Sequence, residues 1–416
     1  MKGNFLRPIE IMAPVGSFES LQAAVQAGAD SVYFGLGSLN MRSKSSLNFT
    51  LDDLTEITRI CKENKIKTYL TLNTVMYDQD LLLMKTLVDA AKEHQVSALI
   101  ASDQSVIEYG RSAGMEIHLS TQINISNYQS LKFYSSYADV VVLARELNLE
   151  QVSEIARQIG VDQLRGPSGD LMRIEMFVHG ALCMATSGKC YMSLHQYNSS
   201  ANRGACLQGC RRSYIVTDKD SGDELLIDNE YIMSPKDLCT IGFTDKLLAA
   251  GVEVLKIEGR ARPPEYVKTT VSCYREAVHA VMDGSYNRDK IDDWTEKLAT
   301  VFNRGFWDGY YLGRRLGEWS EVYGSKATRR KLYLGKGMNY FDRLGVAEFL
   351  IETHELSVGD EILITGPSTG VIQLSIEEMR VDDQIVQSVQ KGTRFSIKTE
   401  QKVRRSDKLF KWIEPD

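Results

Sequence analysis

Short apolar runs rich in β-branched residues alternate with amphipathic helical patterns along the first 259 residues. Helical patterns begin at Ser17, which suits an N-cap, and recur near residues 51–64, 79–94, 103–113, 126–137 and 148–159. Eight runs read as strands, at residues 9–14, 31–37, 67–74, 97–102, 116–121, 139–145, 173–180 and 252–259. A doubly wound sheet shares this alternation, but eight strands match the count of a TIM barrel. The sequence therefore predicts an α/β fold built on a TIM-like (β/α)8 barrel.

The rest of the chain predicts a second domain, because 416 residues exceed the roughly 250 that one barrel absorbs. From about residue 332 six short strand patterns with glycine turns follow one another, which is typical of a small all-β barrel or sandwich. We predict a barrel domain over residues 1–325 and a C-terminal β-barrel domain over residues 332–416. The first domain carries a Cys-rich insertion at 181–251 with a small hairpin near 213–229, and trailing helices up to Gly284 and over 292–302.

Polar and charged side chains gather where the predicted strands end, which is the functional face of a TIM barrel. Gln122 and Asn124 suit a polar ligand, with loop capping as the alternative. Arg145 and Arg260 suit a bidentate grip on a carboxylate or phosphate. These four are the candidate substrate-binding residues of the barrel.

Four residues near the ends of the last two strands are candidate catalytic residues: Glu175, His179, Lys256 and Glu258. By strand alternation Glu175 faces the barrel interior, so it needs a cationic partner, either Lys256 or Arg260. His179 is a candidate general base or metal ligand, with a hydrogen-bonded structural histidine as the alternative.

Residues 174–212 hold four of the seven cysteines, and a fifth, Cys239, lies downstream. Clustered among glycines and arginines, Cys183, Cys190, Cys206 and Cys210 occupy an electropositive setting that favours thiolates. Their wide spacing favours an iron–sulfur cluster, while zinc, plain packing and a free redox thiol stay open. Cys61 and Cys273, by contrast, sit in helical patterns and are expected to pack. Because the stretch follows the seventh strand directly, we expect it to cover the barrel mouth as a lid.

Composition points to a soluble globular protein, with 43% hydrophobic and 25% charged residues. The N-terminal residues lack the apolar core of a signal peptide and no apolar run is long enough for a membrane span, so we expect a cytoplasmic protein. The net charge of −6 argues against a surface that coats nucleic acid everywhere. Two late basic runs, 326–336 and 402–411, provide local positive charge, with a solvated face as the alternative. HExxH, G-x-S-x-G and P-loop motifs are absent from the sequence.

Several blocks of the chain resemble one known family. EMFVHGALCMATSGKCYMS, APVGSFESLQAAVQAGADSVYFG, STQINISN, NRGACLQGCR, SPKDLC and KIEGRARPPEYV are similar to blocks of the collagenase-like peptidase family U32. The resemblance extends to the C-terminal β domain, which looks like that of the tRNA-hydroxylating members. The text after the second strand, LNMRSKSSLNFT, departs from the family pattern, so substrate contacts there are not carried over.

This resemblance implies an enzyme with a 4Fe-4S cluster that helps form 5-hydroxyuridine at the wobble position of tRNA, with prephenate as a required small carboxylate metabolite. Carried over by motif, the cluster ligands are Cys183, Cys190, Cys206 and Cys239, with Cys210 as an alternative to one of them. The tRNA anticodon loop would contact Arg329, Arg330 and aromatic side chains, because splayed bases stack on aromatic rings. The aromatic candidates are Trp307, Tyr310, Tyr311, Trp319 and Tyr323. Two rival functions stay open, a peptidase and a non-catalytic iron–sulfur scaffold.

Overall fold

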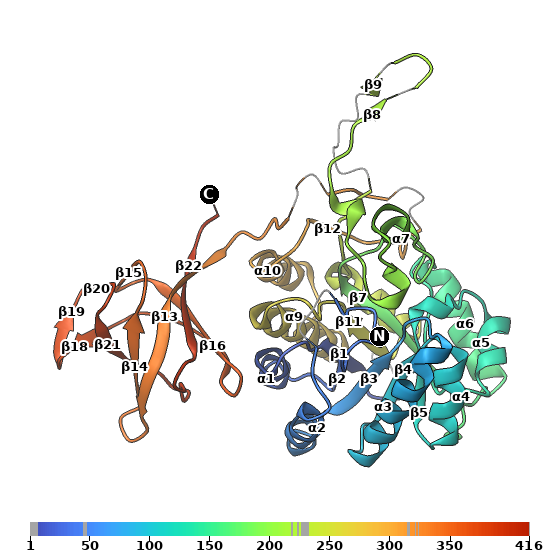
Figure 1. The fold of residues 1–416 in the computed structure, drawn as a ribbon, viewed down its shortest axis with the longest axis horizontal. Helices are drawn as coiled ribbons and strands as arrows, with labels where there is room; N and C mark the ends of the chain where they lie inside the picture. Colours follow the sequence, from blue (N-terminus) through green and yellow to red (C-terminus); the bar gives the residue numbers. More distant parts are fainter. Residues whose placement is uncertain are drawn as a thin grey trace.

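The protein is described from a computed structural model that covers residues 7–44, 48–217, 219–222, 224–225, 233–313, 317–320, 322 and 324–415. Its first part is a closed barrel of eight parallel strands, in which each strand pairs with the next and β11 pairs with both β7 and β1 (Figure 1). The strands are β1 Glu10–Pro14, β2 Ser31–Phe34, β3 Lys67–Leu72, β4 Ala98–Ala101, β5 Glu116–Leu119, β6 Val140–Val142, β7 Arg173–Gly180 and β11 Val254–Ile257. The predicted (β/α)8 barrel is confirmed.

Helices form the outer layer of the barrel, and local sequence explains where several of them begin and end. Ser17, Asp103, Asn127 and Asn148 cap four helices by accepting a hydrogen bond from a first-turn amide. Pro264 opens the longest helix of the barrel domain, which ends at Gly284 with φ +80°. The helices are α1 Phe18–Gln26, α2 Asp53–Glu63, α3 Leu81–Glu93, α4 Gln104–Ser112, α5 Tyr128–Tyr134, α6 Leu149–Val161, α8 Thr244–Ala249, α9 Pro264–Asp283 and α10 Arg288–Ala299.

The long connection between β7 and β11 contains α7 Met192–Tyr197 and the predicted hairpin, formed by β8 Val216–Thr217 and β9 Glu224–Leu225. It also contains β10 Asp237–Cys239, which runs antiparallel to β7 and parallel to β12 Phe306–Trp307. Neither β10 nor β12 follows from the sequence pattern, and the stretch around Phe306 reads as a turn. Strands of two or three residues are too short to display a period, so they are recognised only from their pairing, β10 with β7 and β12 with β10.

The C-terminal part is all-β, as predicted, with an antiparallel sheet in the order β17-β16-β22-β13-β14-β21-β18-β19 and a separate β15–β20 pair. It contains more strands than the six that the sequence suggested. The basic run near residue 408 reads as a surface segment, yet residues 408–413 form a strand that pairs with β13 and β16, in which Leu409 is fully buried and Lys411 forms an ion pair with Asp360. The strands are β13 Arg330–Phe341, β14 Val346–Ile351, β15 Glu355–Ser357, β16 Glu361–Gly366, β17 Gly370–Ser375, β18 Met379–Val381, β19 Gln384–Val386, β20 Ser388–Gln390, β21 Arg394–Lys398 and β22 Lys408–Ile413.

The two parts contact each other through β17, which packs against α1 and α9. Gln26 of α1 donates to the Thr369 carbonyl at 2.9 Å and accepts from the Val371 amide at 3.0 Å. Lys268 of α9 donates to the Val371 carbonyl at 2.8 Å. The C-terminal domain therefore packs against two outer helices of the barrel, α1 and α9. Of the helices that the structure describes, none has the length and hydropathy to cross a bilayer.

Candidate functional site

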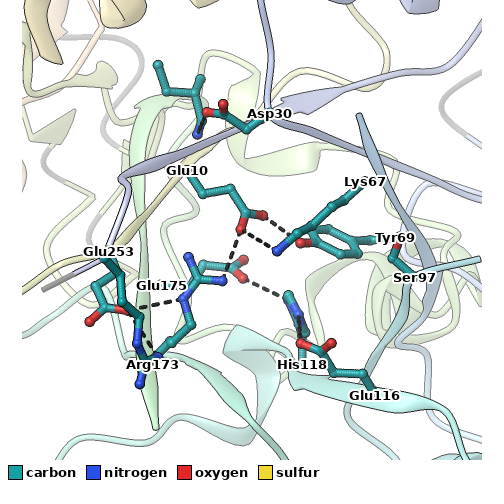
Figure 2. A network of polar contacts seen from close by, with 12 residues as sticks. Glu10, Asp30, Lys67, Tyr69, Ser97, Glu116, His118, Arg173, Glu175 and Glu253 are labelled. Atoms are coloured by element: carbon teal, nitrogen blue, oxygen red, sulfur yellow. Dashed lines mark hydrogen bonds and ion pairs between the residues drawn. The ribbon is translucent and has the colours of Figure 1, made fainter. Parts of the chain in front are cut away.

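The N-terminal end of the barrel is closed by buried ion pairs (Figure 2). The Glu10 carboxylate accepts from Arg173 at 3.0 Å and from the Tyr69 hydroxyl at 2.6 Å, and lies 3.5 Å from the Lys67 ammonium. Burial alone would raise the pKa of Glu10, but Arg173 and Lys67 lower it to about 2. Arg173 also donates to Glu253 at 3.1 Å. Since these groups satisfy one another, a ligand site is expected at the opposite end of the barrel.

The middle of the barrel holds a second buried pair. The Lys256 ammonium lies 2.6 Å from Glu175 Oε1, and both side chains are at most 5% exposed. His118 lies between Glu175, at 3.4 Å, and Glu116, at 3.2 Å. Burial disfavours the charged forms of Glu175 and His118. Lys256 nevertheless holds the pKa of Glu175 below its usual value, and the carboxylates of Glu116 and Glu175 raise the pKa of His118. The predicted inward Glu175 with a cationic partner is confirmed, the partner being Lys256. Sequence reasoning missed His118, although strand alternation could have placed it inside.

Glu258 stands at the barrel mouth, just after β11. Its carboxylate accepts from Arg42 at 2.5 and 3.1 Å and from the Tyr33 hydroxyl at 3.2 Å. Burial raises the pKa of Glu258, but Arg42 above all, with Arg260 and Arg145, lowers it to about 2. Glu258 is therefore a fixed anion at neutral pH, suited to orienting cations rather than to giving up a proton. Arg42 lies in the stretch that departs from the family pattern, which is why the sequence did not assign it a role.

Arg260 and Arg145 also face the mouth. Arg260 is 5% exposed and donates to the Thr71 hydroxyl at 2.7 Å, and burial lowers its pKa to about 10. Arg145 donates to the Ser187 hydroxyl at 2.8 Å and lies over the Phe177 ring at 5.3 Å. Arg42, Arg260 and Arg145 all lie near the carboxylate of Glu258. The mouth therefore carries excess positive charge and is suited to an anionic ligand.

Gln122 and Asn124 have different surroundings. Gln122 lines a pocket of about 380 Å³ beside the mouth, together with Asn73, Ser102 and Lys189. Asn124 has the left-handed conformation, φ +58°, and donates to the carbonyls of Gln122 at 2.7 Å and Ser187 at 3.0 Å. Gln122 therefore reaches a cavity that can hold a polar ligand, whereas the contacts of Asn124 are those of loop capping.

His179 is not with the other candidate catalytic residues. A register shift between β7 and β11 places His179 opposite Ile257, whose side chain points out of the barrel. The ring lies 5.6 to 5.9 Å from the rings of Tyr266, Tyr274 and Phe306, and burial lowers its pKa to about 3. The bulge thus turns His179 outward into an aromatic core, away from the mouth where sequence reasoning put it.

The Cys-rich segment 181–212, called the lid below, is bound to the loops around the barrel mouth. The Lys44 amide donates to the Gly204 carbonyl at 3.3 Å, and the Val75 amide to the Asn202 carbonyl at 3.1 Å. Arg203 forms an ion pair with Asp80 at 2.6 Å. On the other side of the mouth Arg145 and Asn124 bind Ser187. The expected position of this segment over the mouth is confirmed.

Within the lid, Cys210 lies near three other cysteines, Cys183, Cys190 and Cys206. The pKa of Cys210 is raised, chiefly by burial and further by those three thiols. All four are free thiols and at least partly accessible. Cys239 is elsewhere: it is buried in β10 opposite His179, and burial raises its pKa to about 11. Cys210 therefore lies near the other three cysteines of the lid, whereas Cys239 lies in β10 opposite His179.

The chemistry of these thiols fits a cluster that takes four thiolates from separate short segments. Arg42 lies near Cys206, and Arg211 near Cys183 and Cys210, so cations would offset the negative charge of such a group. As they stand, no three His, Cys, Asp or Glu side chains of the described residues converge tightly enough to hold a metal ion. Binding of a cluster would therefore require these thiols to draw closer together.

The predicted RNA contacts beyond the barrel are mostly engaged in structure. Arg329 forms an ion pair with Glu361, and Arg330 is an exposed residue of β13. Trp307 is buried in β12, and its indole donates to the Lys236 carbonyl at 3.1 Å. Tyr311 is also buried and donates to the Phe177 carbonyl at 2.8 Å.

Tyr310 and Trp319 are half-buried, with Tyr310 packed edge-on against the Trp307 ring, whereas Tyr323 lies outside the described residues. The aromatic side chains of this stretch thus mainly pack β12 and the residues after it against the barrel domain. Sequence reasoning read it as an exposed surface because β12 was not recognised as a strand.

Comparison with known proteins places the chain in a family. The model of "Peptidase family U32" matches residues 16–321. A "Collagenase" of Porphyromonas gingivalis is 62% identical over 97% of this chain and 97% of its own length. The "tRNA hydroxylation protein P1" of Bacillus subtilis is 30% identical over 90% of this chain and 87% of its own length. The "23S rRNA 5-hydroxycytidine C2501 synthase" of Escherichia coli is 32% identical over 74% of this chain and 46% of its own length. The chain therefore belongs to peptidase family U32.

Proposed function

We propose that this protein is a cytoplasmic iron–sulfur enzyme that forms 5-hydroxyuridine at the wobble position of tRNA, with prephenate as a bound carboxylate. The observation that carries the proposal is the group of four free thiols, Cys183, Cys190, Cys206 and Cys210, in a lid over a cationic barrel mouth. Relatives named for tRNA and rRNA hydroxylation support the reaction class.

The four thiols would hold a 4Fe-4S cluster, which when bound supplies electrons one at a time to the hydroxylation. The chain's own residues set the environment of that chemistry. Arg42 and Arg211 compensate negative charge at the thiols. The ion pairs around Glu10 close the far end of the barrel, so the reacting groups meet at the mouth alone.

A small carboxylate fits the barrel mouth. Among the described residues, the Arg260 guanidinium donates a hydrogen bond to the neutral hydroxyl of Thr71 and lies near the carboxylate of Glu258. A buried cation with so little compensation gains most from a bidentate anionic ligand. Arg145, which bridges the mouth and the lid, is placed to sense whether that ligand is present.

The lid offers a surface for unpaired nucleotides. Tyr77 is 53% exposed and lies under the Arg203 guanidinium at 4.0 Å, and Tyr191 is 69% exposed. Tyr197 is 38% exposed, with Arg212 over its ring at 5.3 Å. Bases of a single-stranded loop stack on such rings and on guanidinium planes. These residues replace the buried aromatic stretch of β12 as candidates for RNA contact.

The test compares Cys210→Ala with Cys239→Ala in anaerobically purified protein. We expect Cys210→Ala to lose its iron and sulfide and to leave tRNA without 5-hydroxyuridine in a deletion strain. Cys239→Ala should keep iron, because that thiol packs in β10. The opposite result would assign Cys239 to the ligand set. Iron-free wild-type protein would sink the cluster, and a cluster-bound protein without any effect on tRNA would favour the scaffold.

A peptidase is the second candidate, and the collagenase-named relative at 62% identity favours it. A serine or cysteine peptidase needs a base within hydrogen-bond reach of its nucleophile. The buried His118 bonds to carboxylates, and His179 has no hydrogen-bond partner for Nδ1 among the described residues. Cleavage of denatured collagen by the purified protein, unchanged in Cys210→Ala, would support proteolysis instead of hydroxylation.

A further inference from the structure

A second pocket, of about 530 Å³, adjoins the lid on the side of Cys206, away from the pocket of Gln122. Its lining contains four arginines and no carboxylate among the described residues. Phe302 forms part of the wall, with the Arg262 guanidinium 3.4 Å and the Arg304 guanidinium 5.1 Å from its ring centroid. The arginines come from the lid, from the loop after β11 and from the turn after α10: Arg211, Arg212, Arg262 and Arg304.

The charges of this arginine pocket do not balance. Arg304 lies 3.3 Å from the buried Asp237. Among the described residues, the Arg211 guanidinium donates to neutral oxygens, the carbonyls of Leu182 and Pro235 at 2.6 Å and the hydroxyl of Ser234 at 2.9 Å.

Arg262 adds to the excess of positive charge, because its guanidinium has no hydrogen-bond or ion-pair partner within the described part of the chain. Burial lowers the pKa of both Arg211 and Arg262, as expected of cations short of an anionic partner. Among the described residues, Asp237 is the carboxylate that acts on Arg211, Arg262 and Arg304, with Glu258 as a weaker influence on Arg262, so positive charge is in excess in this partly desolvated cavity. Such an arrangement favours an anionic oxygen ligand such as a phosphate group, which a guanidinium can bind with two hydrogen bonds.

We propose that this pocket binds a backbone phosphate of the RNA substrate, next to the nucleotide that is modified. This inference rests on the proposed function for the identity of the RNA. The lining of the pocket includes Arg212, which donates to the Tyr197 hydroxyl at 2.9 Å and lies over that ring at 5.3 Å. A phosphate held against Arg262 would place its nucleotide beside Cys206, while the attached strand passes over the exposed ring of Tyr197.

The barrel mouth, with Arg260 and Arg42 around Glu258, has its own separate excess of positive charge for a small carboxylate. The two cationic sites therefore serve different ligands: a metabolite inside the mouth and a phosphate of the polymer beside the lid. A free phosphate ion shares the chemistry of the second site, so the experiment has to separate the two sources.

The test measures binding of an unmodified tRNA anticodon stem-loop to the purified holoprotein by fluorescence anisotropy across a salt series. Arg262→Gln removes a guanidinium that no described residue binds, so folding and iron content should be retained. We expect about tenfold weaker binding and a salt slope reduced by about one, since one phosphate contact is lost. Arg262→Lys should keep the slope and lose part of the affinity, because the charge stays and the planar fork does not.

The matched control is Arg157→Gln, which removes an exposed guanidinium of α6 that pairs with Glu154. It should leave affinity and slope unchanged. If Arg262→Gln binds RNA like wild type but no longer binds inorganic phosphate, the pocket binds a free anion instead of the RNA backbone. That result would overturn the inference. If the salt slope falls as expected but the wild-type protein leaves tRNA without 5-hydroxyuridine, the phosphate site stands and the proposed reaction fails.

Discussion

Glu10 shows how one buried carboxylate ties the stability of the barrel to pH. Its folded pKa of about 2 lies below the ordinary value of 4.5, so its stabilisation is present above pH 4.5 and is lost as the pH falls toward 2. Glu10→Gln should lower the free energy of unfolding at pH 7 by about 3 kcal/mol, because Arg173 loses a buried partner. It should also flatten the fall in stability between pH 5 and 3. Urea unfolding at the three pH values tests this, and an equally steep fall in the variant would contradict it.

Arg260 makes a different prediction, about ligand binding. Arg260→Lys keeps a charge at the mouth but removes the fork that can bind a carboxylate with two hydrogen bonds. We expect prephenate to bind at least tenfold more weakly, as measured by calorimetry on the purified protein. Gln122→Ala, which alters the neighbouring pocket, serves as the control and should have a smaller effect. Equal affinities for wild type and Arg260→Lys would remove Arg260 from the metabolite site.

For single residues, the sequence predicts side-chain directions that follow strand alternation, but not the contacts between residues that come from different loops. The Glu175–Lys256 pair was predictable, because β7 and β11 are neighbours and both residues face inward. His179 was not, since one bulge reverses the direction of its side chain. Arg262 and Arg304 were missed as well, because they meet only through the path of the segments after β11 and α10.

The lid is the element on which the proposed chemistry depends, and Gly204 is its tightest point. Gly204 has φ +81°, and a methyl group there would overlap the Asn40 carbonyl and the Ser43 side chain. Gly204→Ala should therefore displace the lid from the loop after β2. We expect loss of most bound iron while far-UV circular dichroism, dominated by the barrel, stays close to wild type.

Gly169→Ala is the matched control for that substitution. Gly169 has a similar φ of +86° but open space where the methyl group would lie. Both variants carry the same backbone strain, so a difference between them reports the close approach alone. If Gly169→Ala lost iron to the same degree, the effect would come from general destabilisation and the lid would not be seated as described.

Elements with a clear period were predicted well, and short or mixed ones were not. All eight barrel strands match their predicted runs to within a few residues, because buried parallel strands are continuous apolar segments. β22 was missed because its lysines, Lys408 and Lys411, dominate its appearance while Leu409 supplies the core contact. The sequence also could not decide between Cys210 and Cys239 as the fourth cysteine of the cluster, because the position of Cys239 depends on the pairing of β10 with β7.

At the scale of the whole molecule, the sequence predicts two domains but not how they meet. The change of pattern near residue 332 agrees with the start of β13 at Arg330. The contact itself involves single polar groups, such as Lys331 with Glu265 at 2.7 Å, and these follow no period that a sequence could display. Its consequence is mechanical: the C-terminal domain is fixed to α1 and α9, the two helices that flank β1 and the loop of Arg262.

Gln26 is the residue through which this coupling can be tested. Its amide both donates to and accepts from the backbone of β17, so Gln26→Leu leaves the Thr369 carbonyl and the Val371 amide without these partners. Two lost hydrogen bonds should weaken the contact by about 2 kcal/mol and allow β17 to open more often. Hydrogen exchange followed by mass spectrometry should then show faster exchange in β17 but unchanged exchange in β14, which lies inside the C-terminal sheet. If β14 lost protection equally, the substitution would have destabilised the whole domain; unchanged β17 would mean that the two parts are held together by the remaining contacts of Lys268 and Lys331.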